Sequence, residues 1–175
     1  IVIGLIRIAG SVPVLRWAFA GALIAITVDF SDLFWMGVLD LGGLPNYQTF
    51  DKWIDVVYML TFLWVANKWD GPERKITLVL FGFRMVGFVA FELTQIRPIL
   101  LAFPNVFEFW FVSIAIRRHY WPKYEMTRQR IIRWLIIVLV LKLTQEWVLH
   151  GGQYLDSFTL FEAVEAMWNF IAFWN

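Results

Sequence analysis

The chain has 175 residues, of which 60% are hydrophobic and 19% are aromatic, and its formal net charge at pH 7 is +1. With a mean hydropathy of +0.64, this composition excludes an ordinary soluble domain. The absence of cysteine excludes disulfide bonds and thiol chemistry. The sequence therefore predicts a protein that lies in a lipid bilayer.

Six apolar runs are long enough to cross a bilayer, whose hydrocarbon core of about 30 Å requires roughly 20 apolar residues per helix. In chain order the expected helices are residues 12–28, 53–69, 76–95, 99–116, 131–149 and 158–174. The apolar character is continuous along each run, which favours helices. We therefore expect an all-α, polytopic integral membrane helical bundle that forms a single transmembrane domain over residues 1–175.

The two ends of the chain leave alternatives open. The segment Ile1 to Ala9 is also apolar, so the first helix could begin earlier. The last run contains Glu162 and Glu165 and could lie along the membrane surface, but its aromatic residues occur on all sides, which favours a span. Because the chain starts with isoleucine and no cleavage site follows the first run, we expect further residues before Ile1 and no removed signal peptide.

The charges of the connections predict the orientation. Basic residues gather in the connections between the second and third and between the fourth and fifth helices: Lys68, Arg74, Lys75, Arg117, Arg118, Lys123, Arg128 and Arg130. The long connection after the first helix is acidic: Asp29, Asp32, Asp40 and Asp51 against Lys52. Since basic loops stay in the cytoplasm, we expect both termini to be cytoplasmic, the acidic loop to be external, and the location to be a bacterial inner membrane.

Ionisable residues inside the expected helices point to a polar interior. A charge at the bilayer centre costs a few kcal/mol, so each one requires a partner or a watery cavity. A turn near Pro98 places Arg84 and Glu108 at about the same depth, and a turn at Gly151-Gly152 places Lys142 level with Glu162 or Glu165. Two buried ion pairs are therefore predicted.

A polar face is also predicted in the fifth helix. Lys142, Glu146 and His150 follow an i, i+4, i+8 spacing, so they share one side of that helix. Arg84 and Glu92 lie on one side of the third helix. Together with Asp55, these side chains are expected to line a solute pocket in the outer half of the membrane. The expected pocket residues are Arg84, Glu92, Glu108, Lys142, Glu146, His150 and Glu162.

The alternative for these charges is that they only neutralise one another and set the helix register. Glu146 and His150 lack the second histidine of a zinc helix. A Ca²⁺ or Mg²⁺ site from Asp29, Asp32 and Asp40 is open by geometry, although such loops are more often simply solvated. The sequence contains no phosphate-binding or nucleophile motif. We therefore assign no catalytic residue, metal ligand or cofactor.

Three functions fit these observations. The first is a small bundle that binds or translocates a small polar or ionic solute, which requires a water-filled cavity between the third, fifth and sixth helices. The second is a non-catalytic subunit that packs in a larger membrane complex. The third is an intramembrane acid–base enzyme that uses Glu92, Glu146 and His150. The expected partners are the bilayer, anionic lipids at the basic cytoplasmic loop and other membrane subunits, with no nucleic acid.

Overall fold

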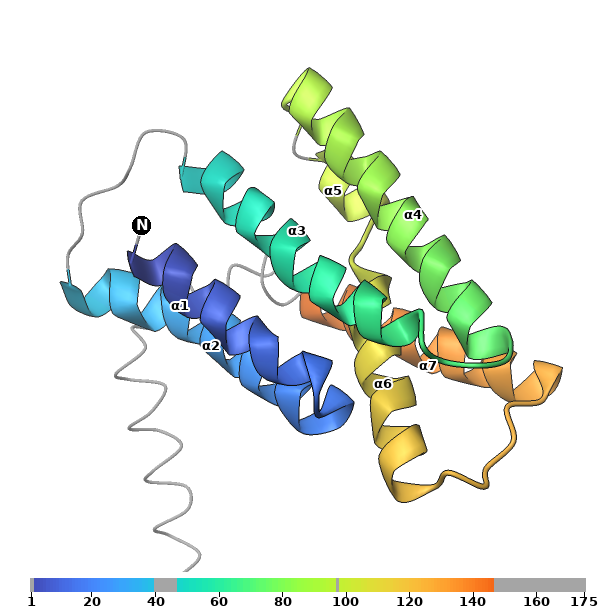
Figure 1. Cartoon of the computed structure of the whole chain (residues 1–175). Helices are drawn as coiled ribbons and strands as arrows, with labels where there is room; N and C mark the ends of the chain where they lie inside the picture. Colours follow the sequence, from blue (N-terminus) through green and yellow to red (C-terminus); the bar gives the residue numbers. More distant parts are fainter. Residues whose placement is uncertain (1, 40–46, 97, 147–175) are drawn as a thin grey trace, which may run out of the picture.

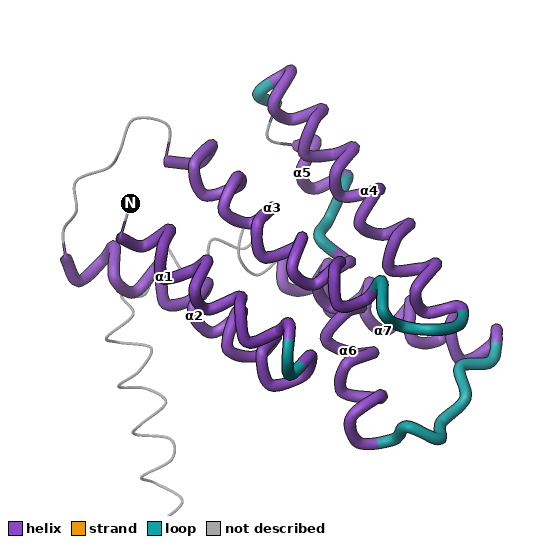
Figure 2. Tube along the Cα trace, in the orientation of Figure 1, coloured by secondary structure: helices purple, strands orange, loops and turns teal. Residues whose placement is uncertain are grey.

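The computed structural model describes residues 2–39, 47–96 and 98–146, and every regular element in these ranges is a helix (Figures 1 and 2). The elements are α1 (Val2–Ser11), the 3-10 helix η1 (Val12–Leu15), α2 (Ala18–Leu39), α3 (Tyr47–Ala66), α4 (Pro72–Thr94), α5 (Pro98–Ala102), α6 (Val106–Tyr120) and α7 (Arg128–Glu146). The all-α prediction is confirmed for this part of the chain.

Helix α6 forms the centre of the bundle, because α2, α3, α4 and α7 all pack against it. Its side chains Phe107, Trp110, Phe111 and Ile114 are fully buried. The ring of Phe111 stacks on that of Phe62 from α3, with 4.3 Å between the ring centroids. Such offset aromatic contacts add to the free energy gained by burial. The short helix α6 is therefore the apolar core around which the longer helices lie.

Two glycines allow close approach between elements. A Cβ at Gly21 of α2 would overlap the backbone of Val14 in η1, and a Cβ at Gly87 of α4 would overlap the side chain of Phe103. Only glycine permits this distance between neighbouring backbones. The α1–α2 hairpin and the contact between α4 and the chain before α6 both depend on these positions.

The outer faces of α4 and α7 are apolar and exposed. Val79 and Leu93 of α4 are 69% and 81% exposed, and Ile136 and Ile137 of α7 are each 56% exposed. In the described ranges, α4 is the one helix that is both long and apolar enough to cross a membrane, by length and composition. Shorter apolar helical stretches are Gly4–Leu15, Ala18–Asp29 and Trp53–Ala66. The number of spans, six, stays a prediction.

The first and fourth expected helices differ from the structure. Residues 12–28 do not form one helix, because Pro13 lies in η1 and α2 starts only at Ala18. The helix then continues to Leu39, so Asp29 lies in a helix and not in a loop. Residues 99–116 are interrupted after Ala102, and α6 begins at Val106. Pro104 explains this break, since it has no N–H for the helix ladder.

The remaining expected helices agree with the structure where it describes them. Expected helices 53–69, 76–95 and 131–149 correspond to α3, α4 and α7, with ends that differ by up to six residues. The expected sixth helix, 158–174, lies outside the described residues. Helix α1 runs antiparallel to α2, so its first residue lies at the end away from the η1 turn (Figure 1). The start of α1 therefore lies away from the end of the bundle where the basic residues gather. For this reason the loop charges do not support a cytoplasmic N-terminus.

Candidate functional site

Arg7 of α1 lies between two carboxylates from two other helices. Its guanidinium forms ion pairs with Asp29 of α2 and Asp55 of α3. The Arg7 side chain is only 5% exposed, whereas those of Asp29 and Asp55 are 33% and 22% exposed. A buried arginine requires such partners, because an unpaired charge in an apolar interior costs several kcal/mol. The arrangement therefore joins α1, α2 and α3 and is open to the surroundings on the carboxylate side.

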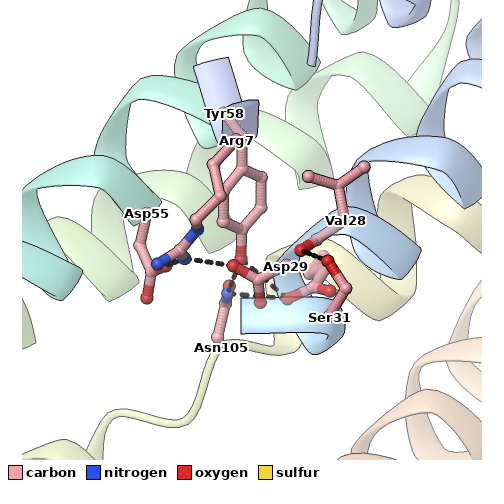
Figure 3. A network of polar contacts seen from close by, with 8 residues as sticks. Arg7, Val28, Asp29, Ser31, Asp55, Tyr58 and Asn105 are labelled. Atoms are coloured by element: carbon pink, nitrogen blue, oxygen red, sulfur yellow. Dashed lines mark hydrogen bonds and ion pairs between the residues drawn. The ribbon is translucent and has the colours of Figure 1, made fainter. Parts of the chain in front are cut away.

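Three further polar side chains extend this arrangement. Tyr58, one turn after Asp55 on α3, donates its hydroxyl hydrogen to Glu108 of α6 at 3.0 Å. The Asn105 amide nitrogen donates to Glu108 at 3.1 Å and to the Tyr58 oxygen at 3.4 Å. Figure 3 shows Arg7, Asp29, Asp55, Tyr58 and Asn105 directed toward one another. We call these five residues and Glu108 the polar cluster.

The interruption between α5 and α6 presents two members of the polar cluster. Asn105 occupies the N-cap position of α6, and Glu108 lies in its first turn. A carboxylate in the first turn is stabilised by the partial positive charge of the helix N-terminus. The carbonyl oxygen of Phe103, just before Pro104, accepts a hydrogen bond from Arg84 Nη1 at 2.9 Å. Arg84 therefore anchors the connection that carries Asn105.

The polar cluster contains a buried amide oxygen beside its carboxylates. Lys142 of α7 lies 5.6 Å from the ring centre of Phe109, the residue after Glu108. In addition, Asn105 is only 6% exposed, and its Oδ1 has no hydrogen-bond partner among the described residues. This buried oxygen suits a further hydrogen-bond donor, such as an N–H group of a cation.

The structure brings together only part of the expected pocket. Glu108 belongs to the polar cluster, and buried Lys142 donates to Gln145 at 2.8 Å. Glu92 of α4 is half-buried, and its Oε1 is buried without a hydrogen-bond partner in the described part of the chain. Glu146 is the last residue of α7, and its side chain lies outside the described residues, as do His150 and Glu162. The predicted Lys142 pairs with Glu146, Glu162 or Glu165 stay predictions.

The predicted ion pair between Arg84 and Glu108 is wrong. Arg84 donates to the Phe103 carbonyl, and Glu108 accepts from Tyr58 and Asn105. The prediction assumed one unbroken helix after Pro98. Because the chain is interrupted between Ala102 and Val106, Arg84 binds the carbonyl exposed at the break.

Sequence reasoning missed Arg7 and assigned Asp29 to another role. The signal for Arg7 is a single charge within the apolar segment Ile1 to Ala9. Asp29 was expected in an external acidic loop that could bind a divalent cation, but it lies in α2 and pairs with Arg7. No group of three or more His, Asp or Glu side chains in residues 2–39, 47–96 and 98–146 has an arrangement that could hold a metal ion.

The space between the third and fifth expected helices is apolar where the structure describes it. A groove of about 470 Å³ between α4 and α7 is lined only by apolar residues, among them Val79, Phe83, Leu135 and Leu139. The polar side chains gather instead where α1, α2, α3 and α6 meet. A solute path through this part of the bundle would therefore follow the polar cluster and not the α4–α7 groove.

Comparisons with known proteins add no family to these observations, because no family model, no curated protein and no solved structure matches the chain.

Proposed function

We propose that this protein is a multipass helical membrane protein that binds a small ammonium-type cation through hydrogen bonds at the polar cluster and translocates it across the bilayer. The observation that carries the proposal is the buried Asn105 Oδ1, which has no hydrogen-bond partner among the described residues and lies in a cluster with carboxylates from three helices. Charged side chains inside a membrane commonly mark ion or solute pathways.

The depth of the carboxylates supports this proposal. Asp29 lies eleven residues after Ala18, Asp55 eleven residues before Ala66, and Glu108 twelve residues before Tyr120. At 1.5 Å per residue these positions are about 16–18 Å from the helix ends. The start of α2 and the ends of α3 and α6 lie together, because one pocket is lined by residues at or near all three: Ala18, Trp69 and Tyr120. In a bilayer core of about 30 Å, the three carboxylates would thus share a level near the middle.

The broken helix gives a second kind of support. Irregular backbone at membrane depth is tolerated only where it is buried in protein or lines a cavity. Pro104 and Asn105 are both buried. In many transporters, an interrupted helix supplies the side chains and the helix terminus that bind the transported solute. The interruption between α5 and α6 would likewise present Asn105, Glu108 and the N-terminus of α6 to the solute.

The membrane location and orientation belong to this proposal. Exposed apolar faces of this extent on α4 and α7 are rare on soluble monomers. The connections 67–71 and 121–127 lie at the same end of the bundle (Figure 1), and the helix ends that flank them contain the basic residues Arg74, Lys75, Arg117, Arg118, Arg128 and Arg130. The positive-inside rule would place this end in the cytoplasm of a bacterial inner membrane.

The experiment is a binding measurement on the full chain in lipid nanodiscs. The melting temperature is recorded with ammonium or methylammonium chloride, and with choline chloride at equal ionic strength. At a concentration of 100 times the dissociation constant, a bound cation should stabilise the protein by about 2.7 kcal/mol. We expect one of the small cations to raise the melting temperature relative to choline.

Two variants and one control assign the effect to the polar cluster. Asp55→Asn and Asn105→Leu should abolish the cation response, while Asp70→Asn, an exposed aspartate outside the cluster, should keep it. A response should be followed by flux of the same cation into liposomes. If no small cation acts differently from choline on a well-folded protein, cation binding is rejected and the complex-subunit alternative takes its place.

A further inference from the structure

A second pocket lies at the basic end of the bundle, where the η1–α2 junction, the end of α3 and the end of α6 meet. Its volume is about 490 Å³. The side chains that define its chemistry are Arg16, Trp17, Trp69, Arg118, His119 and Tyr120. None of these residues belongs to the polar cluster. We call this the basic pocket.

The two arginines of the basic pocket have free hydrogen-bond donors. Arg16 lies 5.4 Å from the ring centre of Trp17, and Arg118 lies 5.6 Å from that of Trp69. Neither guanidinium forms a hydrogen bond or ion pair with a described residue, and no carboxylate lines the pocket. Indole rings hold an arginine in place without using its N–H groups. Two oriented guanidinium groups without an internal anion are suited to the oxygens of a phosphate.

The aromatic residues of the basic pocket indicate a lipid as the source of that phosphate. Trp17 and Tyr120 are 58% and 57% exposed, although both are large rings. The ring of His119 lies 4.7 Å from that of Tyr120, measured between centroids. Exposed Trp and Tyr rings beside arginines are typical of the membrane–water interface, where the glycerol and acyl chains of a lipid would contact them. A soluble phosphate would require no exposed rings.

We propose that the basic pocket binds the phosphodiester headgroup of an anionic phospholipid from the cytoplasmic leaflet. This inference uses the membrane orientation proposed above but not the cation site. Anionic lipids are concentrated in that leaflet, and each lysine or arginine near its surface contributes about 1 kcal/mol to their attraction. Bidentate contact from Arg16 and Arg118 distinguishes this pocket from general attraction to the basic connections.

The test compares lipids on the full chain purified in a neutral detergent. Phosphatidylglycerol, phosphatidylcholine and free glycerol phosphate are titrated, and bound lipid is counted by native mass spectrometry together with the melting temperature. We expect one phosphatidylglycerol to be retained and to raise the melting temperature, with no comparable effect of phosphatidylcholine. Equal stabilisation by glycerol phosphate would show a soluble phosphate site and overturn the lipid assignment.

Matched variants separate the pocket from overall charge. Arg16→Gln/Arg118→Gln should weaken phosphatidylglycerol binding by about ten-fold or more. Arg128→Gln/Arg133→Gln, which removes the same charge from exposed residues of α7, should leave binding within about two-fold of the wild type. Equal losses in both double variants would mean a diffuse basic surface and would overturn the proposal.

Two further measurements keep the result interpretable. Arg16→Lys/Arg118→Lys keeps the charge but loses the planar guanidinium, so it should bind less tightly than the wild type and more tightly than the glutamine variant. Wild-type affinity in the lysine variant would contradict bidentate recognition. The cation response of the polar cluster should persist in all three variants, so failure of the lipid site and failure of the proposed function are distinguishable.

Discussion

Arg7 is the residue that joins three helices through charge. Its guanidinium pairs with Asp29 and Asp55, and it is almost fully buried. Removal of one partner from a buried ionic group leaves the others uncompensated, which usually costs more than the whole group contributes. The stability of the α1–α2–α3 unit should therefore depend on charge balance more than on the arginine itself.

We expect Arg7→Met to lower the free energy of unfolding by about 3–5 kcal/mol, because two carboxylates then lack their cation. The triple variant Arg7→Met/Asp29→Asn/Asp55→Asn should recover a large part of this loss. Arg133→Met, at an exposed arginine of α7, serves as the control and should stay near wild type. The measurement is denaturant unfolding in mixed micelles. A triple variant as unstable as the single one would show that packing and not charge explains the effect.

Which charged residues lie in the interior was predictable where a charge stands alone in a long apolar run. Glu108 and Lys142 were both assigned to the interior on this ground, and Glu108 lies in the polar cluster while Lys142 is buried. Partner choice was not predictable, because it depends on which helices pack together. Arg7 and Asp29 meet only because α1 folds back on α2, and the sequence has no local signal for that hairpin beyond Pro13.

At the scale of elements, the approach of α4 to the connection before α6 is set by Gly87. A Cβ there would overlap Phe103, whose carbonyl is held by Arg84. The same helix contains Gly82, where an added Cβ would meet no heavy atom within 4 Å. Gly87 and Gly82 are therefore a matched pair of substitution sites on one helix, the first closely packed and the second open.

We expect Gly87→Ala to destabilise the protein by about 1–3 kcal/mol, since the added methyl group must push Phe103 away. Gly82→Ala should instead stabilise it by about 0.5–1 kcal/mol through higher helix propensity. Thermal unfolding of both variants in the same detergent checks the difference. Similar effects at the two positions would argue against close packing of α4 on Phe103. Gly87→Ala should also weaken the cation response, because Asn105 follows Phe103 closely.

Helix positions were predictable when the apolar run was uninterrupted. The expected helix 76–95 corresponds to α4, which starts four residues earlier and ends one residue earlier. The apolar run 99–116 predicts one continuous helix although it contains Pro104, because its apolar length outweighs a single proline. The expected first helix, 12–28, ends before Asp29, because the apolar pattern stops at this charge. A charge that finds a partner in the fold does not end a helix, and α2 continues for ten more residues.

At the scale of the whole molecule, orientation rests on the basic connections at one end. The absence of native cysteine allows a single introduced thiol to report on its own location. Lys123 lies in the exposed connection between α6 and α7, and Gln95 is exposed at the opposite end of α4. These two positions test the two faces of the membrane.

We expect Lys123→Cys to resist a membrane-impermeant maleimide in intact bacteria and to react after permeabilisation, because the proposed orientation places the basic helix ends beside it in the cytoplasm. Gln95→Cys should react in intact cells. Labelling is read from a mass shift on gels. The reverse pattern would invert the orientation and remove the cytoplasmic leaflet as the source of the bound lipid, without affecting the cation site.

If the protein is the proposed membrane bundle, the unequal hydrophobicity of its helices bears on how the chain would enter the bilayer during synthesis. Helix α4 meets the length and apolarity of a span by itself, whereas the apolar stretches before it are shorter. Arg7 and Asp29 would each oppose entry alone, but the α1–α2 hairpin brings them together as a neutral pair. We therefore expect the insertion machinery to accept α1 and α2 as one unit and α4 independently, so that biogenesis depends on an ion pair formed before the rest of the protein is made.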